Sequence, residues 1–398
     1  MQFKSIQLGK GKEEAVLRRH PWIFSGAINT KASDACVDGD LVAVYTFNNK
    51  LLGYGHWNEG SIAVRIISFG EEAPNQQFWT NRFANAFASR EMLGLGLDKK
   101  TNCYRLIHGE GDNLSGLIVD IYADYIAIQC HSIGMYLSLP FILEGLKQAA
   151  PFKIKGIYNK SSHTLPRHFA ETIADSWLFG NSEEPLIEVR ENNYKFGIDF
   201  IKGQKTGFFL DQRENRMLLG NYSEGKSVLN TFCYSGGFSV YALGGGAQKV
   251  VSVDMSDKAI ELVNSNMELN FGKDYPKHLA VNSDVQTYLK ETEELFDLVI
   301  LDPPAYAKTL QKRHSAVQGY KRLNILGIGR VKPGGLLATF SCSQVVSREL
   351  FYNTVVSACH ETGRQARVLY QITQGPDHPV NIFHQEGSYL KGLVLQLD

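Results

Sequence analysis

The residues best suited to chemistry stand just after short apolar runs in the second half of the chain. The most distinctive segment is Asp302-Pro303-Pro304-Ala305-Tyr306, the 302–306 loop, which follows the apolar run 298–301. Two prolines stiffen the backbone there and hold a carboxylate and an aromatic ring in fixed positions. Such a loop suits a planar base that stacks on the ring and hydrogen-bonds to the acid. A rigid loop without a chemical role is the less favoured interpretation.

A cysteine occupies a similar position after another apolar run. Cys342 lies between two serines, directly after residues 336–340. A stabilised thiolate at the ligand-binding edge of a sheet can act as a nucleophile. Cysteine more often packs as a small buried hydrophobe, so the position alone leaves both roles open.

Three further strand ends carry groups suited to a nucleoside cofactor. The run 228–230 leads into a turn with paired glycines, where backbone N–H groups can approach a ligand. Asp254 ends the next run and can accept hydrogen bonds from ribose hydroxyls, although it could also cap a helix. Asp284 could contact an adenine amino group or cap the helix that begins near Val285, and both interpretations stay open.

The charged residues between positions 303 and 348 are all basic. They are Lys308, Lys312, Arg313, Lys321, Arg322, Arg330, Lys332 and Arg348. The whole chain has 41 basic and 41 acidic residues, so its net charge does not indicate a nucleic-acid binder. A local basic rim around the 302–306 loop and Cys342 would nevertheless attract a polyphosphate substrate. The alternative is a solvated helix face, which ordinarily mixes both signs.

The elements that must position these groups alternate between strands and helices. Short apolar runs stand at 228–230, 250–253, 278–281, 298–301 and 336–340, with helical stretches between them. This alternation predicts a parallel, doubly wound α/β sheet with helices on both faces. Ligands of such sheets bind at the carboxyl ends of the strands, where the candidate groups stand. We assign this α/β domain to residues 188–398.

Two smaller domains are expected before it. Residues 1–70 contain short strands at 40–45, 51–55 and 61–67, which predicts a small β domain. Residues 71–187 are expected to form an α+β domain. Its elements are helices at 76–93 and 139–149 and strands at 103–109, 117–130 and 156–159. With 398 residues, of which 43% are apolar, the chain can bury a core in each domain.

Several classes of protein are not expected from this sequence. The six cysteines form no C-x-x-C pair and have no histidine at zinc-ligand spacing, so we predict neither a disulfide framework nor a metal site. The N-terminus has no apolar signal region, and no run approaches the 18 or so apolar residues of a membrane span. We therefore predict a soluble cytoplasmic protein without membrane contact.

Four phrases, in this order, resemble a known enzyme family. They are GQKTGFFLDQRENR (203–216), VLNTFCYSGGFSVYAL (228–243), ILDPPAYAK (300–308) and TFSCSQ (339–344). They resemble class I S-adenosylmethionine (SAM)-dependent methyltransferases, and more narrowly the bacterial large-subunit ribosomal RNA 5-methylcytosine methyltransferases. The resemblance covers nearly the whole chain. It implies SAM as cofactor, large-subunit rRNA as substrate, an N-terminal RNA-binding PUA domain, a central α+β domain and a C-terminal Rossmann-like methyltransferase domain.

The resemblance also implies roles for individual residues. The implied cofactor contacts are Phe232, Cys233, Tyr234, Ser235, Gly236, Asp254, Asp284 and Asp302, with Lys205, Thr206, Phe208, Asp211 and Arg213 as a wall of the cofactor pocket. Cys342 would be the nucleophile, which adds to carbon 6 of cytosine, and Asp302 would assist it. The implied substrate contacts are Pro303, Pro304 and Tyr306 of the base-binding loop, and the basic stretch adds Lys308, Lys312 and Arg313 as expected phosphate contacts.

One position departs from the pattern of many RNA 5-methylcytosine enzymes. No second cysteine follows Pro303, so the residue that assists release of the product has no assignment. Related enzymes with a D-P-P loop methylate guanine amino groups, and an exocyclic-amino RNA methyltransferase with a structural Cys342 is therefore one alternative. A non-catalytic RNA-binding or ribosome-assembly factor is another. A small-molecule methyltransferase would leave the two N-terminal domains unexplained. The oligomeric state is open, with a homodimer as one candidate.

Overall fold

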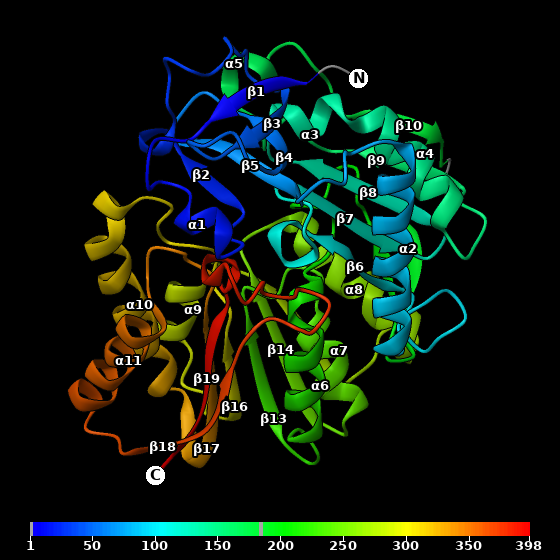
Figure 1. The fold of residues 1–398 in the computed structure, drawn as a ribbon. Coiled ribbons are helices and arrows are strands. Elements are labelled where there is room, and N and C mark those ends of the chain that lie inside the picture. The colour runs from blue at the N-terminus through cyan, green and yellow to red at the C-terminus, as the bar shows by residue number, and fades with distance from the viewer. Residues whose placement is uncertain (1–2, 183–185) are drawn as a thin grey trace. The chain divides into compact units, whose positions relative to one another are not determined.

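The computed structural model describes residues 3–182 and 186–398, which fall into two compact units (Figure 1). The first unit contains the described residues up to Asn193, together with Ile198–Leu210 and Pro376–Gly387. The second unit contains Tyr194–Gly197, Asp211–Gly375 and Ser388–Asp398. Each unit is therefore assembled from stretches that are separated in the sequence. The domain boundaries expected at 70 and 187 stay a prediction.

The first unit begins with a five-stranded sheet. Its strands are β1 (Lys4–Gln7), β2 (Trp22–Phe24), β3 (Leu41–Tyr45), β4 (Leu51–Trp57) and β5 (Ile62–Phe69), in the order β1-β3-β4-β5-β2, and α1 (Glu14–Leu17) precedes β2. The alternating residues Ile6, Val42, Val44, Val64 and Ile66 form part of its core. The three predicted strands are present, and β1 and β2 are additions of four and three residues, too short to give a clear alternation.

A second five-stranded sheet follows in the same unit. Its strands are β6 (Cys103–His108), β7 (Leu117–Tyr122), β8 (Tyr125–Cys130), β9 (Gly156–Asn159) and β10 (Ser176–Gly180), in the order β10-β9-β8-β7-β6. Its helices are α2 (Gln76–Met92), α3 (Ile133–Leu137), α4 (Leu139–Ala149) and α5 (Arg167–Ala170). The single strand predicted over 117–130 was wrong, because the chain reverses after Tyr122 and pairs Tyr122 with Tyr125. Ala123 makes this turn with a φ of 55°, without the glycine or proline that usually marks one.

The second unit is built around a seven-stranded sheet. Its strands are β13 (Ser227–Thr231), β14 (Lys249–Asp254), β15 (His278–Asn282), β16 (Phe296–Leu301), β17 (Val331–Ser341), β18 (Ala366–Ile372) and β19 (Lys391–Leu397). The order is β15-β14-β13-β16-β17-β19-β18. The first five strands are parallel, as predicted, whereas β19 pairs antiparallel with both β17 and β18. Separately, β11 (Ile187–Glu191) and β12 (Tyr194–Ile198) form a two-stranded sheet.

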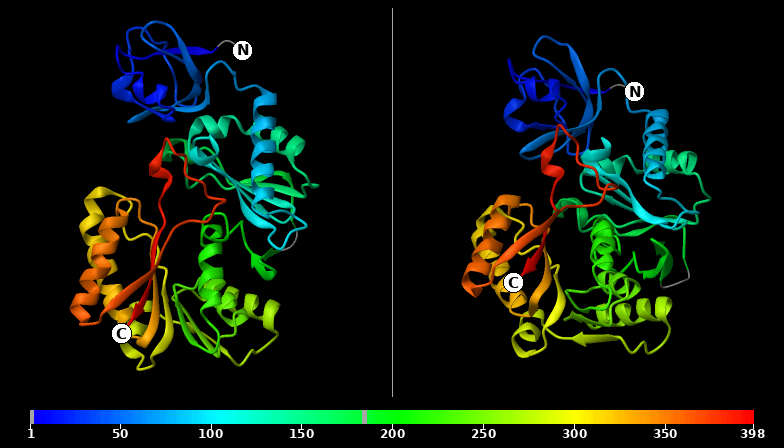
Figure 2. Two further views of the ribbon diagram at one scale, coloured as in Figure 1. Left: turned by 60° about the horizontal axis from the view of Figure 1, so that its bottom comes forward. Right: turned by 90° about the horizontal axis from the view of Figure 1, so that it is seen from below.

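Helices cover both faces of the seven-stranded sheet (Figure 2). They are α6 (Arg213–Asn221), α7 (Gly237–Gly244), α8 (Asp257–Phe271), α9 (Val285–Glu291), α10 (Arg313–Ile328) and α11 (Arg348–Thr362). The central strands are buried on both sides, which explains why they are continuous apolar runs rather than alternating ones. The strand order reverses direction between β13 and β16, and the carboxyl ends of strands at such a switch point form the ligand crevice of doubly wound sheets.

Candidate active site

The candidate residues leave three neighbouring strands at the same edge of the sheet. Thr231 at the end of β13 pairs with Leu301 at the end of β16, and Leu301 also pairs with Thr339 of β17. The turn that begins at Phe232, the 302–306 loop and the turn with Cys342 therefore start from adjacent strands. The register brings together three groups that are spread over residues 232–342 of the sequence.

The turn after β13 has an unusual backbone. The φ values of Phe232, Tyr234 and Gly236 are 53°, 45° and 75°. They lie in the left-handed region, which residues other than glycine rarely adopt. The N–H of Gly236 donates to the Cys233 carbonyl at 2.7 Å, and the Asn266 amide donates to the Ser235 carbonyl at 2.9 Å. Contacts from α8 thus hold a strained turn in place. A strained backbone persists only where surrounding contacts stabilise it, and such backbone is common at ligand sites.

The two acids expected to bind the nucleoside make different contacts. Asp254 accepts the N–H of Tyr234 at 3.1 Å through Oδ2 and the N–H of Ser256 at 3.0 Å through Oδ1. It therefore ties the turn after β13 to the start of α8, whose N-cap is Ser256. Asp284 caps α9, since its Oδ1 accepts the Thr287 N–H at 2.9 Å. Capping is thus observed for Asp284, and its contact with adenine stays a prediction.

Asp302 is half-buried and held by an amide relay. Gln212 is 3% exposed and donates from Nε2 to Oδ2 of Asp302 at 3.0 Å. Asn215 in turn donates to Oε1 of Gln212 at 2.6 Å. Burial, with the nearby charge of Asp211, raises the pKa of Asp302 to about 7. We did not single out Gln212 and Asn215 in the sequence, although both lie in the 203–216 phrase and their spacing of three places them on one helical face.

Asp211 offers an unsatisfied acceptor in the same region. Its Oδ2 accepts the hydroxyl of Tyr389 at 2.5 Å, whereas its Oδ1 is buried and has no hydrogen-bond partner among the residues that the structure describes. A buried carboxylate oxygen without a donor is costly, which favours a ligand that supplies one. Asp211 also acts electrostatically on Asp302. Two neighbouring carboxylates suit a cationic ligand group such as an ammonium.

Cys342 lies in a turn that is tied to the 302–306 loop. Its side chain is half-buried. The hydroxyl of Ser343, the next residue, donates to the Ala307 carbonyl at 2.6 Å, and Nζ of Lys391 donates to the Ser343 carbonyl at 2.7 Å. Lys391 is a further residue that the sequence did not reveal, because only the pairing of β19 with β17 brings it here.

The 302–306 loop presents its side chains unequally. Pro303 is buried and Pro304 is exposed. The ring of half-buried Tyr306 lies 4.6 Å from the ring of Tyr320 in α10, centroid to centroid. Burial, with the nearby Tyr320, raises the pKa of Tyr306 to about 12, so the phenol stays neutral at ordinary pH. The loop therefore offers a neutral aromatic ring beside an acid.

The five residues expected to form a wall of the cofactor pocket do not all belong to one unit. Lys205, Thr206 and Phe208 belong to the first unit, whereas Asp211 and Arg213 belong to the second. Thr206 is fully buried and donates to Oδ2 of Asp120 at 2.6 Å. Lys205 is exposed and Phe208 is buried. Arg213 is buried and donates from Nε to Glu214 at 3.0 Å. The role of all five residues as a pocket wall stays a prediction.

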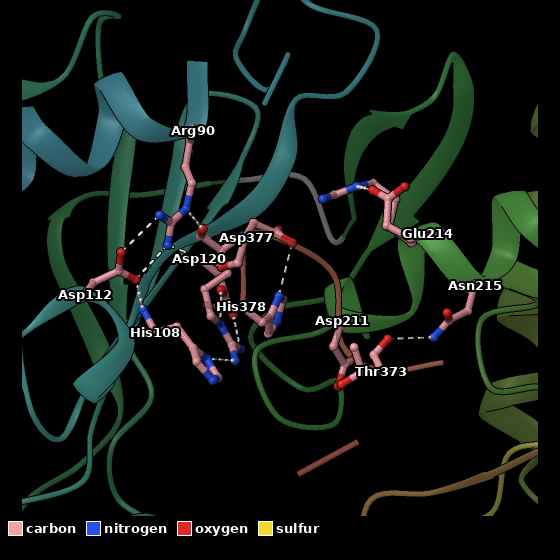
Figure 3. Close-up of polar contacts among 12 residues, drawn as sticks. Arg90, His108, Asp112, Asp120, Asp211, Glu214, Asn215, Thr373, Asp377 and His378 are labelled. Carbon is pink, nitrogen blue, oxygen red and sulfur yellow. Dashed lines mark hydrogen bonds and ion pairs between the residues drawn. The ribbon is translucent and has the colours of Figure 1, made fainter. Parts of the chain in front are cut away.

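A buried polar network that no sequence pattern predicts also lies in the first unit (Figure 3). Arg90 donates to both carboxylate oxygens of Asp112, at 3.0 and 2.6 Å, and Arg105 donates to both of Asp120, at 2.8 and 2.9 Å. Asp377 accepts the N–H of Arg105 at 3.1 Å. His378 lies in the turn that begins at Pro376, with Nδ1 3.2 Å from Oδ1 of Asp377. These residues hold the segment 376–387 against the second sheet.

The basic stretch surrounds the site only in part. Lys308, Lys312 and Arg313 are exposed just beyond the 302–306 loop. Arg330 and Lys332 were wrongly predicted to belong to the rim, because they flank the amino end of β17, opposite the edge where Cys342 lies. Lys332 forms an ion pair with Asp297 at 2.9 Å there. Lys321 likewise pairs with Glu361 at 2.6 Å. The basic residues are continuous in sequence, but the structure distributes them between the two ends of β17.

Two expected absences concern metals and membranes. In the described part of the first unit, His20, His384 and Glu386 bring three possible ligand atoms within 4.8 Å of one another, so the absence of a metal site stays a prediction. No helix within residues 3–182 and 186–398 has the length and apolar character of a membrane span.

Comparison with known proteins identifies similar chains. The family of S-adenosylmethionine-dependent methyltransferases matches residues 143–374, and a PUA-like domain matches residues 6–69. A protein from Aeromonas hydrophila named ribosomal RNA large subunit methyltransferase I is 39% identical over 98% of this chain and 99% of its own length. The protein of the same name from Tolumonas auensis is 37% identical over 98% and 99%.

Solved structures agree on the fold. A putative SAM-dependent methyltransferase from Streptococcus mutans superimposes with a TM-score of 0.83 and 23% identity, over 98% of this chain and 99% of that one. A putative methyltransferase complexed with SAH gives 0.84 at 23% identity, over the same shares of the two chains. The predicted fold class is therefore confirmed: a PUA-like domain precedes a doubly wound methyltransferase domain.

Proposed function

This chain belongs to the family of S-adenosylmethionine-dependent methyltransferases, as do its relatives named ribosomal RNA large subunit methyltransferase I, and we propose that it methylates carbon 5 of a cytosine in large-subunit rRNA. SAM is its cofactor. The observation that carries the proposal is the placement of Cys342 directly after β17, the strand next to the one that leads into the 302–306 loop, with Ser343 hydrogen-bonded to Ala307. A thiol and a base-binding acid at one strand edge suit covalent activation of a pyrimidine.

The acidic residues of the second unit fit the cofactor. Each carboxylate oxygen has two lone pairs, so Asp254 can accept ribose hydroxyls in addition to its backbone bonds. The unsatisfied Oδ1 of Asp211 can accept a hydrogen bond from the ammonium group in the methionine part of the cofactor. When bound, S-adenosylmethionine supplies an electrophilic methyl group. The strained turn at Phe232, Tyr234 and Gly236 would hold the cofactor at the end of β13.

Cys342 performs the central step of the proposed mechanism. Carbon 5 of cytosine is a weak nucleophile, so the Cys342 thiolate first adds to carbon 6 and drives the electron pair of the 5,6 double bond onto carbon 5. Carbon 5 uses this electron pair to bond to the methyl carbon, while the bond between that carbon and the cofactor sulfur breaks and its electron pair stays on the sulfur. The carbon 5 proton then passes to solvent, and its bonding electron pair re-forms the double bond as the Cys342 thiolate is expelled. Because its pKa is about 7, Asp302 can donate a hydrogen bond to the cytosine ring near neutral pH and stabilise the adduct.

Exposed groups around the loop are suited to hold RNA. Lys308, Lys312 and Arg313 can contact phosphates, which contribute affinity and make binding sensitive to salt. The target base must leave any stacked helix to reach the site. Tyr306 already packs one side of its ring near Tyr320, so a flipped base would stack on the other side. The PUA-like domain at 6–69 would bind RNA outside the catalytic site.

A methyl-transfer assay with labelled SAM and unmodified large-subunit rRNA tests this proposal. The wild-type chain should place label in 5-methylcytidine, and Cys342→Ala should lower the rate by more than about a thousandfold, because a nucleophile cannot be replaced by binding alone. Cys359→Ala is the matched control, since Cys359 is also half-buried and outside any disulfide but lies in α11. It should keep wild-type activity.

The same assay tests the competing function. An enzyme that methylates an exocyclic amino group would grip that group with Asp302, which the amide of Gln212 holds in place. It would place label in a methylated amino nucleoside and would retain activity in Cys342→Ala. Cofactor binding without any transfer to RNA would instead indicate a non-catalytic assembly factor. Either result would reject the proposed cytosine chemistry.

A further inference from the structure

Lys391 is a buried lysine on β19, the strand beside the one that Cys342 directly follows. Strand β19 runs antiparallel to β17, and its first residue, Lys391, lies opposite Ser341. The side chain is only 5% exposed, and its Nζ donates to the Ser343 carbonyl at 2.7 Å. The backbone of Lys391 therefore lies opposite Ser341, the residue before Cys342. Its side-chain nitrogen contacts Ser343, the residue after Cys342.

The contact of Lys391 continues into the 302–306 loop. Ser343 is itself buried, and its hydroxyl donates to the Ala307 carbonyl at 2.6 Å. The two bonds form a chain from β19 through the cysteine turn to the residue just after Tyr306. Together with the pairing of Ser341 and Lys391, these two hydrogen bonds fix the backbone before and after Cys342 relative to the 302–306 loop.

The charge of Lys391 lacks a carboxylate partner. Within the described ranges Lys391 forms no ion pair, and its bond to Ser343 is to a neutral carbonyl. The ionisable groups that act on it are Cys342 and Arg348, at the start of α11. Burial, opposed by Cys342 and assisted by Arg348, lowers the pKa of Lys391 to about 8. Cys342 also acts on Tyr320 of α10, whose pKa burial raises to about 12.

We propose that Lys391 is a positioning residue whose ammonium stabilises the Cys342 thiolate and whose bond to Ser343 holds the sulfur beside the base-binding loop. The thiol proton is lost to solvent, and the ammonium provides the opposite charge that the thiolate requires in a partly buried site. The inference rests on the proposed role of Cys342 as nucleophile. Burial of the Lys391 ammonium costs desolvation free energy, and a hydrogen bond to a neutral carbonyl offsets only part of it. A thiolate at Cys342 would supply the opposite charge and so explain why a lysine is buried here.

Alkylation of Cys342 by iodoacetamide measures the effect without RNA or cofactor. The rate is followed from pH 5 to pH 10 on the full-length chain, with peptide mass spectrometry to separate the cysteines. Lys391→Gln removes the charge but can still donate to the Ser343 carbonyl, whereas Lys391→Arg keeps the charge. We expect the midpoint of the alkylation profile to rise by about one pH unit or more in Lys391→Gln, because an adjacent opposite charge shifts ionisation by that much. Lys391→Arg should stay near wild type.

Cys359 provides the internal control in each variant. Its alkylation profile should be the same in all three proteins, and a change there would show that the fold has been disturbed. In that event Lys391→Met, which retains the unbranched chain without a donor, replaces Lys391→Gln. An unchanged Cys342 midpoint in a folded, uncharged variant would overturn the proposal.

Methyl transfer then separates this inference from the proposed function. Lys391→Gln should lower kcat at pH 7 more than it raises KM, and part of the loss should be recovered at higher pH as the thiolate forms without help. If Cys342→Ala retained full activity, the proposed function would fail whatever the alkylation result. If Cys342→Ala were inactive but Lys391→Gln showed a wild-type pH profile, only the role of Lys391 would fail.

Discussion

Two carboxylates, Asp302 and Asp211, set the electrostatics of the candidate site. They lie close enough for one charge to disfavour the other, and the resulting proton affinity of Asp302 falls near the pH of most cells. An acid with such a pKa in a ligand crevice is typical of functional sites. Asp302 can therefore serve as a hydrogen-bond donor when protonated and as an acceptor when ionised. Gln212 holds it in either form, since its amide donates to one oxygen only.

The raised pKa of Asp302 predicts a pH-dependent effect of Asp302→Asn on stability. Burial, with Asp211, raises this pKa from 3.8 to about 7, so the folded chain holds the proton more tightly than the unfolded chain. The stabilisation that results is full below pH 3.8 and is lost as pH rises through 7. Asparagine cannot ionise and still accepts from Gln212. Asp302→Asn should therefore increase the free energy of unfolding at pH 8, with little change at pH 4, in urea titrations.

Asp297→Asn is the matched control for this measurement. Burial raises the pKa of Asp297, but hydrogen bonds from Ser227 and the ion pair with Lys332 outweigh it and lower that pKa overall. Asp297 thus stabilises the fold at neutral pH, and this contribution is lost as pH falls through its lowered pKa. Asp297→Asn should destabilise the chain at pH 8, the opposite sign. Equal effects of Asp302→Asn at pH 4 and pH 8 would contradict the assigned role of burial.

The elements that could be predicted from sequence are those whose burial is complete. Strands β13 and β16 are buried on both faces and appear as continuous apolar runs. The seven-residue strand β18 is largely exposed and gives no such run. The hairpin of β7 and β8 was missed because the turn pair Ala123-Asp124 lacks the glycine that usually marks a two-residue hairpin.

The same limit applies to the site. Residues after the parallel strands could be singled out in the sequence because every such strand ends at one edge of the sheet, and their roles stay a prediction. Gln212, Asn215 and Lys391 were not found, because they reach that edge from a helix start and from an antiparallel strand. Conversely, Arg330 and Lys332 were misplaced because charge along a sequence does not reveal which end of β17 a residue occupies.

The turn between β13 and α7 predicts a specific effect of Gly236→Ala. Gly236 has a φ of 75°, and an added Cβ would lie 3.2 Å from both Cγ atoms of Val263. A left-handed alanine costs about 1–2 kcal/mol, and the contact would shift the turn further. We expect Gly236→Ala to lower the thermal midpoint and to weaken SAM binding by about tenfold in calorimetric titrations, since the turn is expected to hold the cofactor.

Gly225→Ala separates backbone strain from the cofactor effect. Gly225 has a similar φ of 68°, and a Cβ there would meet no atom within 4 Å. It should lower the thermal midpoint to a similar extent while SAM binding stays at the wild-type value. Equal cofactor affinity in the two variants would show that the turn after β13 does not contact the cofactor.

At the scale of the whole molecule, each unit contains segments that are far apart in the sequence. The first unit includes residues 376–387, which the chain reaches only after it has formed most of the second unit. Side-chain contacts hold this segment: Arg105 donates to Asp377, and Asn381 donates to the Glu110 carbonyl at 3.1 Å. No local pattern predicts that this segment returns to the first unit, because neither Asp377 nor Asn381 belongs to a strand or a helix. The first unit is therefore complete only when nearly the entire chain has been made.

This construction predicts that Asp377→Ala weakens the first unit although its position is close to the C-terminus of the chain. Asp377 is fully buried and accepts the Arg105 N–H, so its removal leaves a buried donor unsatisfied beside two arginines. The cost should be about 3 kcal/mol, the usual penalty for breaking a buried charged contact. Hydrogen exchange followed by mass spectrometry should show faster uptake in β6 and β7 and unchanged uptake in β13 and β16. Glu386→Ala, at an exposed residue of the same segment, should leave all four strands unchanged. Uniformly faster exchange in both sheets would contradict the prediction, because it would mean that the two units unfold as one.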